Sequence, residues 1–129
     1  MGTIKKATRP NEIICFMPVA LNTIKDGKCY MFMIMDSYSE FMFQAGTERG
    51  EDMEYVLKQI ERFLSNKDFN KHRGQTFTLV MDDYEEYRNE IEKLIQPHGG
   101  TMVVDAAYIK REMAPAAESF LAIMTKNHR

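Results

Sequence analysis

The 129-residue sequence predicts a single α/β domain with a mixed five-stranded sheet that is flanked by helices. Two observations lead to this fold class. Three apolar segments with strand-like patterning come first, and helix-like and strand-like segments then alternate to the end of the chain. No apolar run approaches the roughly 20 residues that a membrane helix needs. The expected order is three strands, a helix, a strand, a helix, a strand and a final helix.

The N-terminal half is expected to form an antiparallel meander of three strands. Residues 1–11 are predicted to be a flexible arm that precedes one domain over residues 12–129. The strands are expected at residues 12–20, 29–35 and 40–45, where apolar side chains alternate with others or run together. The Lys-Asp-Gly-Lys segment before Cys29 is typical of a turn between the first two strands.

The second half alternates helices with single strands. Apolar residues recur at three- and four-residue steps after residue 51, which is the spacing of an amphipathic helix. The expected elements are a helix over 51–66, a strand over 75–81, a helix over 84–96, a strand over 101–104 and a helix over 116–126. Residues 67–74 are polar, and residues 105–115 are expected to be irregular.

Composition limits the classes of function. The net charge of −2 provides no global basic field to recruit nucleic acid, so any such contact would need a local patch. Cys15 and Cys29 lie in strand-like runs and are expected to be buried, reduced thiols rather than a disulfide or zinc site. The basic N-terminus has no apolar segment behind it, so we expect a cytoplasmic protein. The eleven methionines are expected to fill the core.

Asp82 and Glu118 are the acidic residues whose placement suggests chemistry. Asp82 ends the strand over 75–81, and Glu118 follows thirty-six positions later in the final helix. Mg²⁺ takes carboxylate oxygens and keeps several waters, so two or three converging carboxylates can hold it. A structural interpretation stands beside this one. Asp82 or Asp83 would cap the helix that follows, and Glu118 would be an acid in the first turn of its own helix.

Three short segments carry a resemblance to a known family. Residues 26–39 hold a Gly-Lys pair, then an apolar strand that ends in Asp-Ser-Tyr-Ser. Residues 81–87 read Met-Asp-Asp-Tyr-Glu-Glu-Tyr, and residues 114–119 read Ala-Pro-Ala-Ala-Glu-Ser. Thirty-five residues, 83–117, separate the two acids. In order and spacing these segments resemble the catalytic core of retroviral integrases and related transposases, a ribonuclease H-like fold, and the resemblance covers roughly residues 12–126.

The resemblance implies a Mg²⁺-dependent polynucleotidyl transferase with three carboxylates around two metal ions. Asp82 matches the second carboxylate and Glu118 the third, as catalytic and metal-binding residues. The alignment places Leu21 at the first position, and no carboxylate stands between Glu12 and Asp26. The family's turn after the second carboxylate contains Asn-Gly, where this chain has Asp-Tyr. The cofactor would be Mg²⁺ or Mn²⁺ if the site is active, and none otherwise.

Three hypotheses follow from the sequence. One is an integrase-like enzyme that acts in DNA integration or recombination, and the second is a non-catalytic nucleic-acid-binding or dimerisation module derived from that fold. The third is an unrelated α+β domain whose spacing agrees by chance. Expected partners are DNA, a second copy of the chain or another protein, but no membrane. The candidate phosphate contacts, which ordinary surface charge would also explain, are Lys110, Arg111, Lys126 and Arg129.

Overall fold

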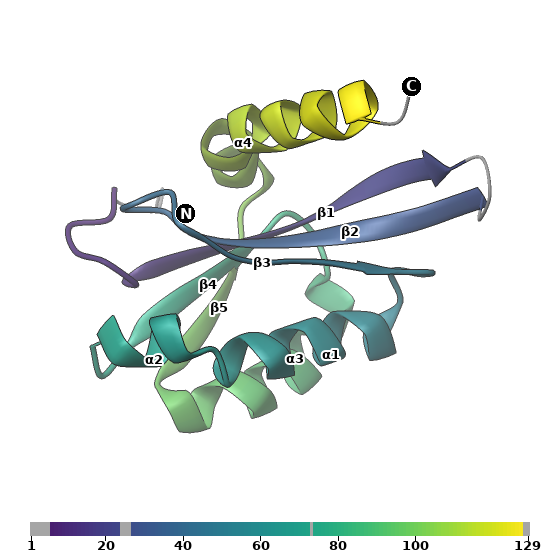
Figure 1. The fold of residues 1–129 in the computed structure, drawn as a ribbon. Coiled ribbons are helices and arrows are strands. Elements are labelled where there is room, and N and C mark those ends of the chain that lie inside the picture. The colour runs from purple at the N-terminus through teal and green to yellow at the C-terminus, as the bar shows by residue number, and fades with distance from the viewer. Residues whose placement is uncertain (1–5, 24–26, 73, 128–129) are drawn as a thin grey trace.

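The chain folds into a central sheet with helices on both faces. The computed structural model describes residues 6–23, 27–72 and 74–127. One long helix, α4 (Ala106–Asn127), lies across one face of the sheet. The helices α1 (Met53–Leu64), α2 (Lys67–His72) and α3 (Arg88–Ile95) cover the opposite face (Figure 1). Among the described residues, no helix is long and apolar enough to cross a membrane.

The sheet is mixed, as the sequence predicts. Its strands are β1 (Ile13–Thr23), β2 (Gly27–Asp36), β3 (Met42–Glu48), β4 (Phe77–Met81) and β5 (Gly100–Val104). Their order across the sheet is β3-β2-β1-β4-β5. The first three strands pair antiparallel, whereas β4 pairs parallel with both β1 and β5. The fold class and the order of the main elements are therefore confirmed.

Alternation along the strands divides the buried side chains into two cores. On β1, Ile14 and Phe16 face the layer of α1, α2 and α3, whereas Cys15 faces α4. The first core is rich in aromatic rings, with Phe63 and Phe69 only 4.2 Å apart between centroids. The α4 side is instead filled by thioethers, namely those of Met31, Met33, Met35 and Met113. Methionine suits such a site because its flexible side chain adapts to irregular gaps.

Residues 67–72 form the helix α2, where the polar sequence predicts no helix or strand. The segment is polar except for Phe69, which is fully buried in the aromatic core. The Asn66 side chain accepts a hydrogen bond from the Phe69 backbone N–H at 3.0 Å, which stabilises the first turn. The buried ring of Phe69 and the Asn66 cap thus stabilise a helix that is too short and polar to show a periodic pattern of apolar residues.

The expectation that residues 105–115 are irregular was wrong. The helix α4 begins at Ala106 and continues without a break through Pro115. The Asp105 carboxylate accepts a hydrogen bond from the Tyr108 backbone N–H at 3.0 Å, which caps the helix. Proline removes one backbone hydrogen bond from a helix interior. Here the packing of Ile109 and Met113 against the sheet holds the helix across that gap.

Two further segments differ in detail from the sequence-based expectation. The helix expected over 84–96 begins as a 3₁₀ turn, and Tyr84 before it has a left-handed backbone with φ 80°. Its ring is buried against Phe16, with centroids 6.1 Å apart. The described part of the expected arm, residues 6–11, packs on the domain. Ala7 is buried beside α4, and Arg9 donates a hydrogen bond to the Thr76 carbonyl.

Candidate functional site

Asp82 and Glu118 lie on the same cavity, which we call the Asp82 cavity. Its volume is about 450 Å³, and it lies between β1, the end of β4 and the middle of α4. The residues that line it are Met17, Pro18, Val19, Ala20, Asp82, Ala106, Ile109, Lys110, Ala114, Ala117 and Glu118. The fold therefore brings together the two acids that the sequence analysis selected.

The Asp82 carboxyl group is in an environment that disfavours its charge. Asp82 follows the last residue of β4 and is half-buried, and its Oδ1 atom is buried with no hydrogen-bond partner among the described residues. Burial raises its pKa, and the charges of Asp83 and Glu51 raise it further. The backbone N–H groups of Asp82 and Asp83 oppose this shift only in part. A proton or a cation would relieve this electrostatic cost.

Glu118 reaches the cavity from an exposed position in the middle of α4. Lys110, Ala114 and Glu118 share one face of the helix because they are spaced four residues apart. Because α4 begins at Ala106, Glu118 does not lie in the first turn of its helix, which was the other interpretation of this residue. The caps of the elements after β4 are Tyr84 and Tyr87, and neither makes a side-chain capping bond. N-capping therefore does not explain Asp82 either.

The strand β1 forms the apolar wall of the cavity opposite the two acids. Phe16 pairs with Met81, the residue before Asp82, so the parallel register places Asp82 beside Met17. The alignment of motifs had placed Leu21 at this position. Leu21 lies four residues further along β1, about 13 Å at the rise of a strand, and does not line the cavity. The strand register therefore places Met17, and not Leu21, beside Asp82.

The residues present do not fit a pair of magnesium ions. Among the described residues, no group of three His, Cys, Asp or Glu side chains is placed to hold a metal ion. Two carboxylates face a wall of Met17, Pro18, Val19 and Ala20, which offer no side-chain oxygen. A two-metal centre needs carboxylates that bridge and flank both ions. The donor set of this cavity is therefore too small for that chemistry.

The basic residues of α4 have different surroundings. Lys110 is exposed and lines the Asp82 cavity. The Arg111 guanidinium lies over the Tyr108 ring at 5.1 Å, and its Nε is 3.5 Å from a Glu112 carboxylate oxygen. The side chain of Lys126 and all of Arg129 lie outside the described part of the structure. Lys110 is therefore the predicted phosphate contact that the fold brings to the cavity.

Sequence reasoning missed the buried polar contact that positions α4. The Ser37 hydroxyl lies 2.7 Å from the Tyr108 hydroxyl and donates a hydrogen bond to a Glu112 carboxylate oxygen at 2.8 Å. Cys15 lies in the same environment, where burial raises the pKa of its thiol to about 12. Ser37 follows β2, so this contact attaches α4 to the sheet. Nothing in the spacing of Ser37 and Tyr108 predicts their contact.

Comparisons with known proteins find similarity in structure alone. No protein-family model and no curated protein sequence matches this chain. A chain of the cryo-EM structure of a simian T-cell lymphotropic virus intasome with the PP2A regulatory subunit B56 gamma matches with a TM-score of 0.62 and 13% identity. The HTLV-2 integrase catalytic core domain, in a dimeric form with magnesium, matches with a TM-score of 0.61 and 10% identity.

The extent of the two matches differs. The first covers 79% of this chain but only 37% of the intasome chain. The second covers 95% of this chain and 79% of the integrase core. Three observations support the same fold. They are the mixed order of the sheet, the long helix across one face and the match to an integrase core over 95% of this chain. The chain has the ribonuclease H-like fold of an integrase catalytic core.

Proposed function

We propose that this chain is an integrase-core-like domain that serves DNA integration or recombination as a non-cleaving binding module. The apolar wall of the Asp82 cavity carries the proposal. Where a third carboxylate would complete the metal site, β1 presents Met17 and the apolar residues that follow it. Burial raises the pKa of the Asp82 carboxyl, and among the described residues its Oδ1 atom has no hydrogen-bond partner, so this carboxyl is not held in its charged form by the protein itself.

A role in binding DNA is supported by the cationic side of α4. Lys110 lies at the rim of the cavity, and Arg111 is exposed beside it. Because the net charge is −2, DNA binding would depend on this local patch and would weaken steeply with salt. The dimeric form of the similar HTLV-2 core favours self-association of this chain as well. A homodimer would carry two such patches.

A second candidate is a metal-dependent nuclease or strand transferase with Asp82 and Glu118 as its metal ligands. The observation in its favour is that both carboxylates line one cavity and that Asp82 Oδ1 lacks a partner among the described residues. Such an enzyme would act with Mg²⁺ or Mn²⁺ through an incomplete ligand set. The two candidates make opposite predictions for cleavage.

Two assays on the same DNA test the two candidates, first for binding and then for cleavage. A labelled 30-base-pair duplex is titrated with the chain, and anisotropy is followed at several salt concentrations. The Lys110→Ala variant is expected to bind less tightly and to show a salt slope smaller by about 0.9, because one phosphate contact is lost. The matched control is Lys93→Ala, which removes an exposed lysine from α3 on the opposite face of the sheet and should bind like the wild type.

Cleavage and strand transfer are then assayed on the same duplex with Mg²⁺ or Mn²⁺. We expect no metal-dependent product from the wild type, and therefore no difference from Asp82→Asn. Metal-dependent nicking that Asp82→Asn abolishes would establish the enzyme instead. Binding that is independent of salt, or unchanged in Lys110→Ala, would contradict the DNA-binding role.

A further inference from the structure

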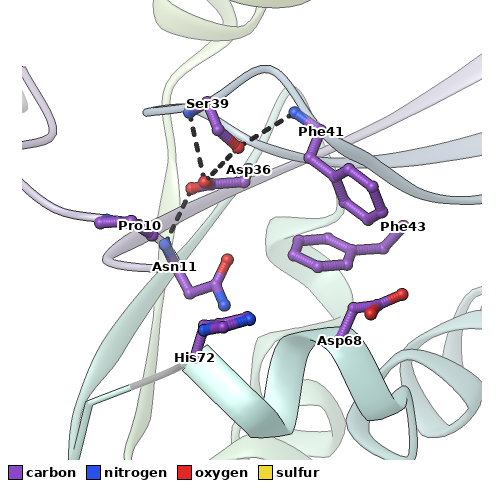
Figure 2. Close-up of a pocket in the computed structure, with 8 residues that line it drawn as sticks. All are labelled: Pro10, Asn11, Asp36, Ser39, Phe41, Phe43, Asp68 and His72. Atoms are coloured by element: carbon purple, nitrogen blue, oxygen red, sulfur yellow. Dashed lines mark hydrogen bonds between the residues drawn. The ribbon is translucent and has the colours of Figure 1, made fainter.

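A second cavity, which we call the Phe41 cavity, lies at the opposite end of β1 from the Asp82 cavity. Its volume is about 480 Å³. The segment before β1, the turn between β2 and β3, and α2 surround it, as Figure 2 shows. The residues that line it are Pro10, Asn11, Asp36, Ser39, Phe41, Phe43, Asp68 and His72. None of them belongs to the Asp82 cavity.

The inner wall of the Phe41 cavity is held rigidly by a buried carboxylate. Asp36 is only 1% exposed and accepts hydrogen bonds from the backbone N–H groups of Asn11 at 3.0 Å and Ser39 at 3.2 Å. The Ser39 hydroxyl donates a further bond at 2.7 Å (Figure 2). The Asn11 side chain in turn donates to the Phe69 carbonyl of α2. The cavity is therefore preformed, which lowers the entropic cost of binding.

Two phenylalanines form the aromatic wall, and an acid lies beneath them. The Phe41 and Phe43 rings meet edge to face with centroids 5.1 Å apart. Phe41 is 48% exposed, and among the large apolar side chains of the described residues Tyr38 alone is more exposed, at 53%. The exposed Asp68 lies on α2 below Phe43 (Figure 2). A ligand in the cavity would touch a ring and a carboxylate together.

We propose that the Phe41 cavity binds an arginine side chain of a partner protein. Asp36 and Asp68 line it, His72 is the one basic residue among its described lining residues, and the net charge of the lining is therefore negative in either form of the imidazole and favours a cation. A guanidinium group stacks on an aromatic face and pairs with a carboxylate through its planar edge, and this cavity offers both contacts. A lysine ammonium would meet the charge but would not use the ring as a stacking surface.

The same charges argue against a nucleic-acid ligand in this cavity. A nucleobase could stack on Phe41, but its phosphates would approach Asp68 and the inner carboxylate of Asp36. The predicted DNA patch, Lys110 and Arg111, belongs to α4 on the other face of the sheet. The Phe41 cavity would therefore dock a protein while α4 contacts DNA. Its role does not depend on whether the chain cleaves or binds DNA.

The test follows backbone amide shifts of the intact, isotope-labelled chain by NMR. The probe is a heptapeptide of glycine and serine with one central arginine, and the control peptide carries citrulline, a neutral isostere, in its place. We expect shifts at Asn11, Phe41 and Asp68 with the arginine peptide, and about fivefold weaker binding of the citrulline peptide. Phe41→Ala and Asp68→Asn should each weaken the arginine peptide by a similar factor. Tyr38→Ala, which alters an exposed ring outside the cavity, should not.

Several outcomes would overturn the proposal. Equal binding of the arginine and citrulline peptides would remove the role of charge, and shifts elsewhere on the chain would remove the cavity. A single-stranded oligonucleotide that shifts the same amides would assign the cavity to nucleic acid. The spectrum of each variant also reports whether it has folded, so a folding defect cannot be mistaken for lost binding. These outcomes do not depend on whether the Lys110→Ala substitution weakens DNA binding.

Discussion

At the scale of single residues, Asp82 is an acid whose surroundings disfavour its charge. Its carboxyl is half-buried beside an apolar strand and close enough to Asp83 and Glu51 to be affected by their charges. A metal ligand would normally gain stability from the ion it binds. Here the same carboxyl costs the fold stability whenever it is ionised.

The Asp82→Asn variant should therefore be more stable than the wild type at neutral pH. The folded-state pKa is above the ordinary value of 3.8, so the folded protein binds more protons than the unfolded chain between these two values. Stability then falls as pH rises through this window, and the loss is complete above the folded pKa. Thermal unfolding at pH 7 should show a Tm higher by a few degrees, and the difference should vanish below about pH 3.8.

The exposed residue Glu61 on α1 offers a control for this prediction. Glu61→Gln removes one negative charge with little burial and should leave the Tm nearly unchanged at both pH values. An Asp82→Asn variant that is destabilised at pH 7 would mean that the ionised carboxylate makes favourable interactions. That result would favour a bound cation at this position.

At the scale of elements, α4 depends on tertiary contacts more than on its own sequence. Asp105 caps its start, and the Ser37–Tyr108–Glu112 contact attaches its first turns to the end of β2. Pro115 interrupts the backbone hydrogen-bond ladder where it would otherwise pair with Arg111. The helix continues because Ile109, Met113 and Ala117 pack on the sheet from both sides of the gap.

Pro115→Ala should increase the free energy of unfolding by about 1–2 kcal/mol, because the lost backbone hydrogen bond returns and the greater freedom of the unfolded chain offsets part of the gain. Pro115 is exposed, so no core contact is removed. Urea denaturation measures the change. The exposed Ser119→Ala, four residues on, should gain no more than about 0.5 kcal/mol from helix propensity alone. Equal effects would mean that Pro115 does not strain the helix.

The same elements show what the sequence could predict. Strands β1, β2 and β4 and helix α1 were predicted because their apolar residues repeat at the strand or helix period over many positions. The helix α2 was missed because Phe69 is its one buried residue, which is too few for any period. The first half of α4 was missed because its stability depends on Ser37, which is more than seventy residues away in sequence.

At the scale of the whole molecule, the length of the β1–β2 hairpin decides where the cavity residues fall. The ladder extends from Ile14 opposite Asp36 to Thr23 opposite Gly27. Counting back from the Gly-Lys motif places Leu21 at the β1 position expected beside Asp82. The parallel register with β4 places Met17 there instead. A count across a hairpin is valid only if the hairpin has the same length in this chain and in the family used for the alignment. Changes of length at the hairpin tip leave the sheet intact. No such hairpin lies between Asp82 and Glu118, and the two residues line one cavity.

Restoring a carboxylate tests this assignment directly. Met17→Asp would place a third acid on the wall that faces Asp82 and Glu118, whereas Leu21→Asp would place one outside the cavity. In EDTA, where no metal ion is bound, both variants should be less stable than the wild type. With 10 mM Mg²⁺, Met17→Asp should regain about 1.4 kcal/mol if its Kd is about 1 mM.

The wild type and Leu21→Asp serve as the controls, and both should show no change in Tm on addition of Mg²⁺. A response of Leu21→Asp that exceeds the response of Met17→Asp would show that the motif count, and not the strand register, locates the missing ligand. Measurement of Tm in EDTA and in Mg²⁺ for the three proteins is sufficient.

The division of the interior into two cores has a consequence for how the molecule opens. The aromatic core beneath α1, α2 and α3 and the methionine core beneath α4 share no side chain among the described residues, and only the sheet joins them. Each core can therefore act as its own cooperative unit of local unfolding. When α4 lifts, its amides become open to solvent exchange while the aromatic unit stays closed. The wall that carries Glu118 and Lys110 is thus the part of the Asp82 cavity that can separate from the rest.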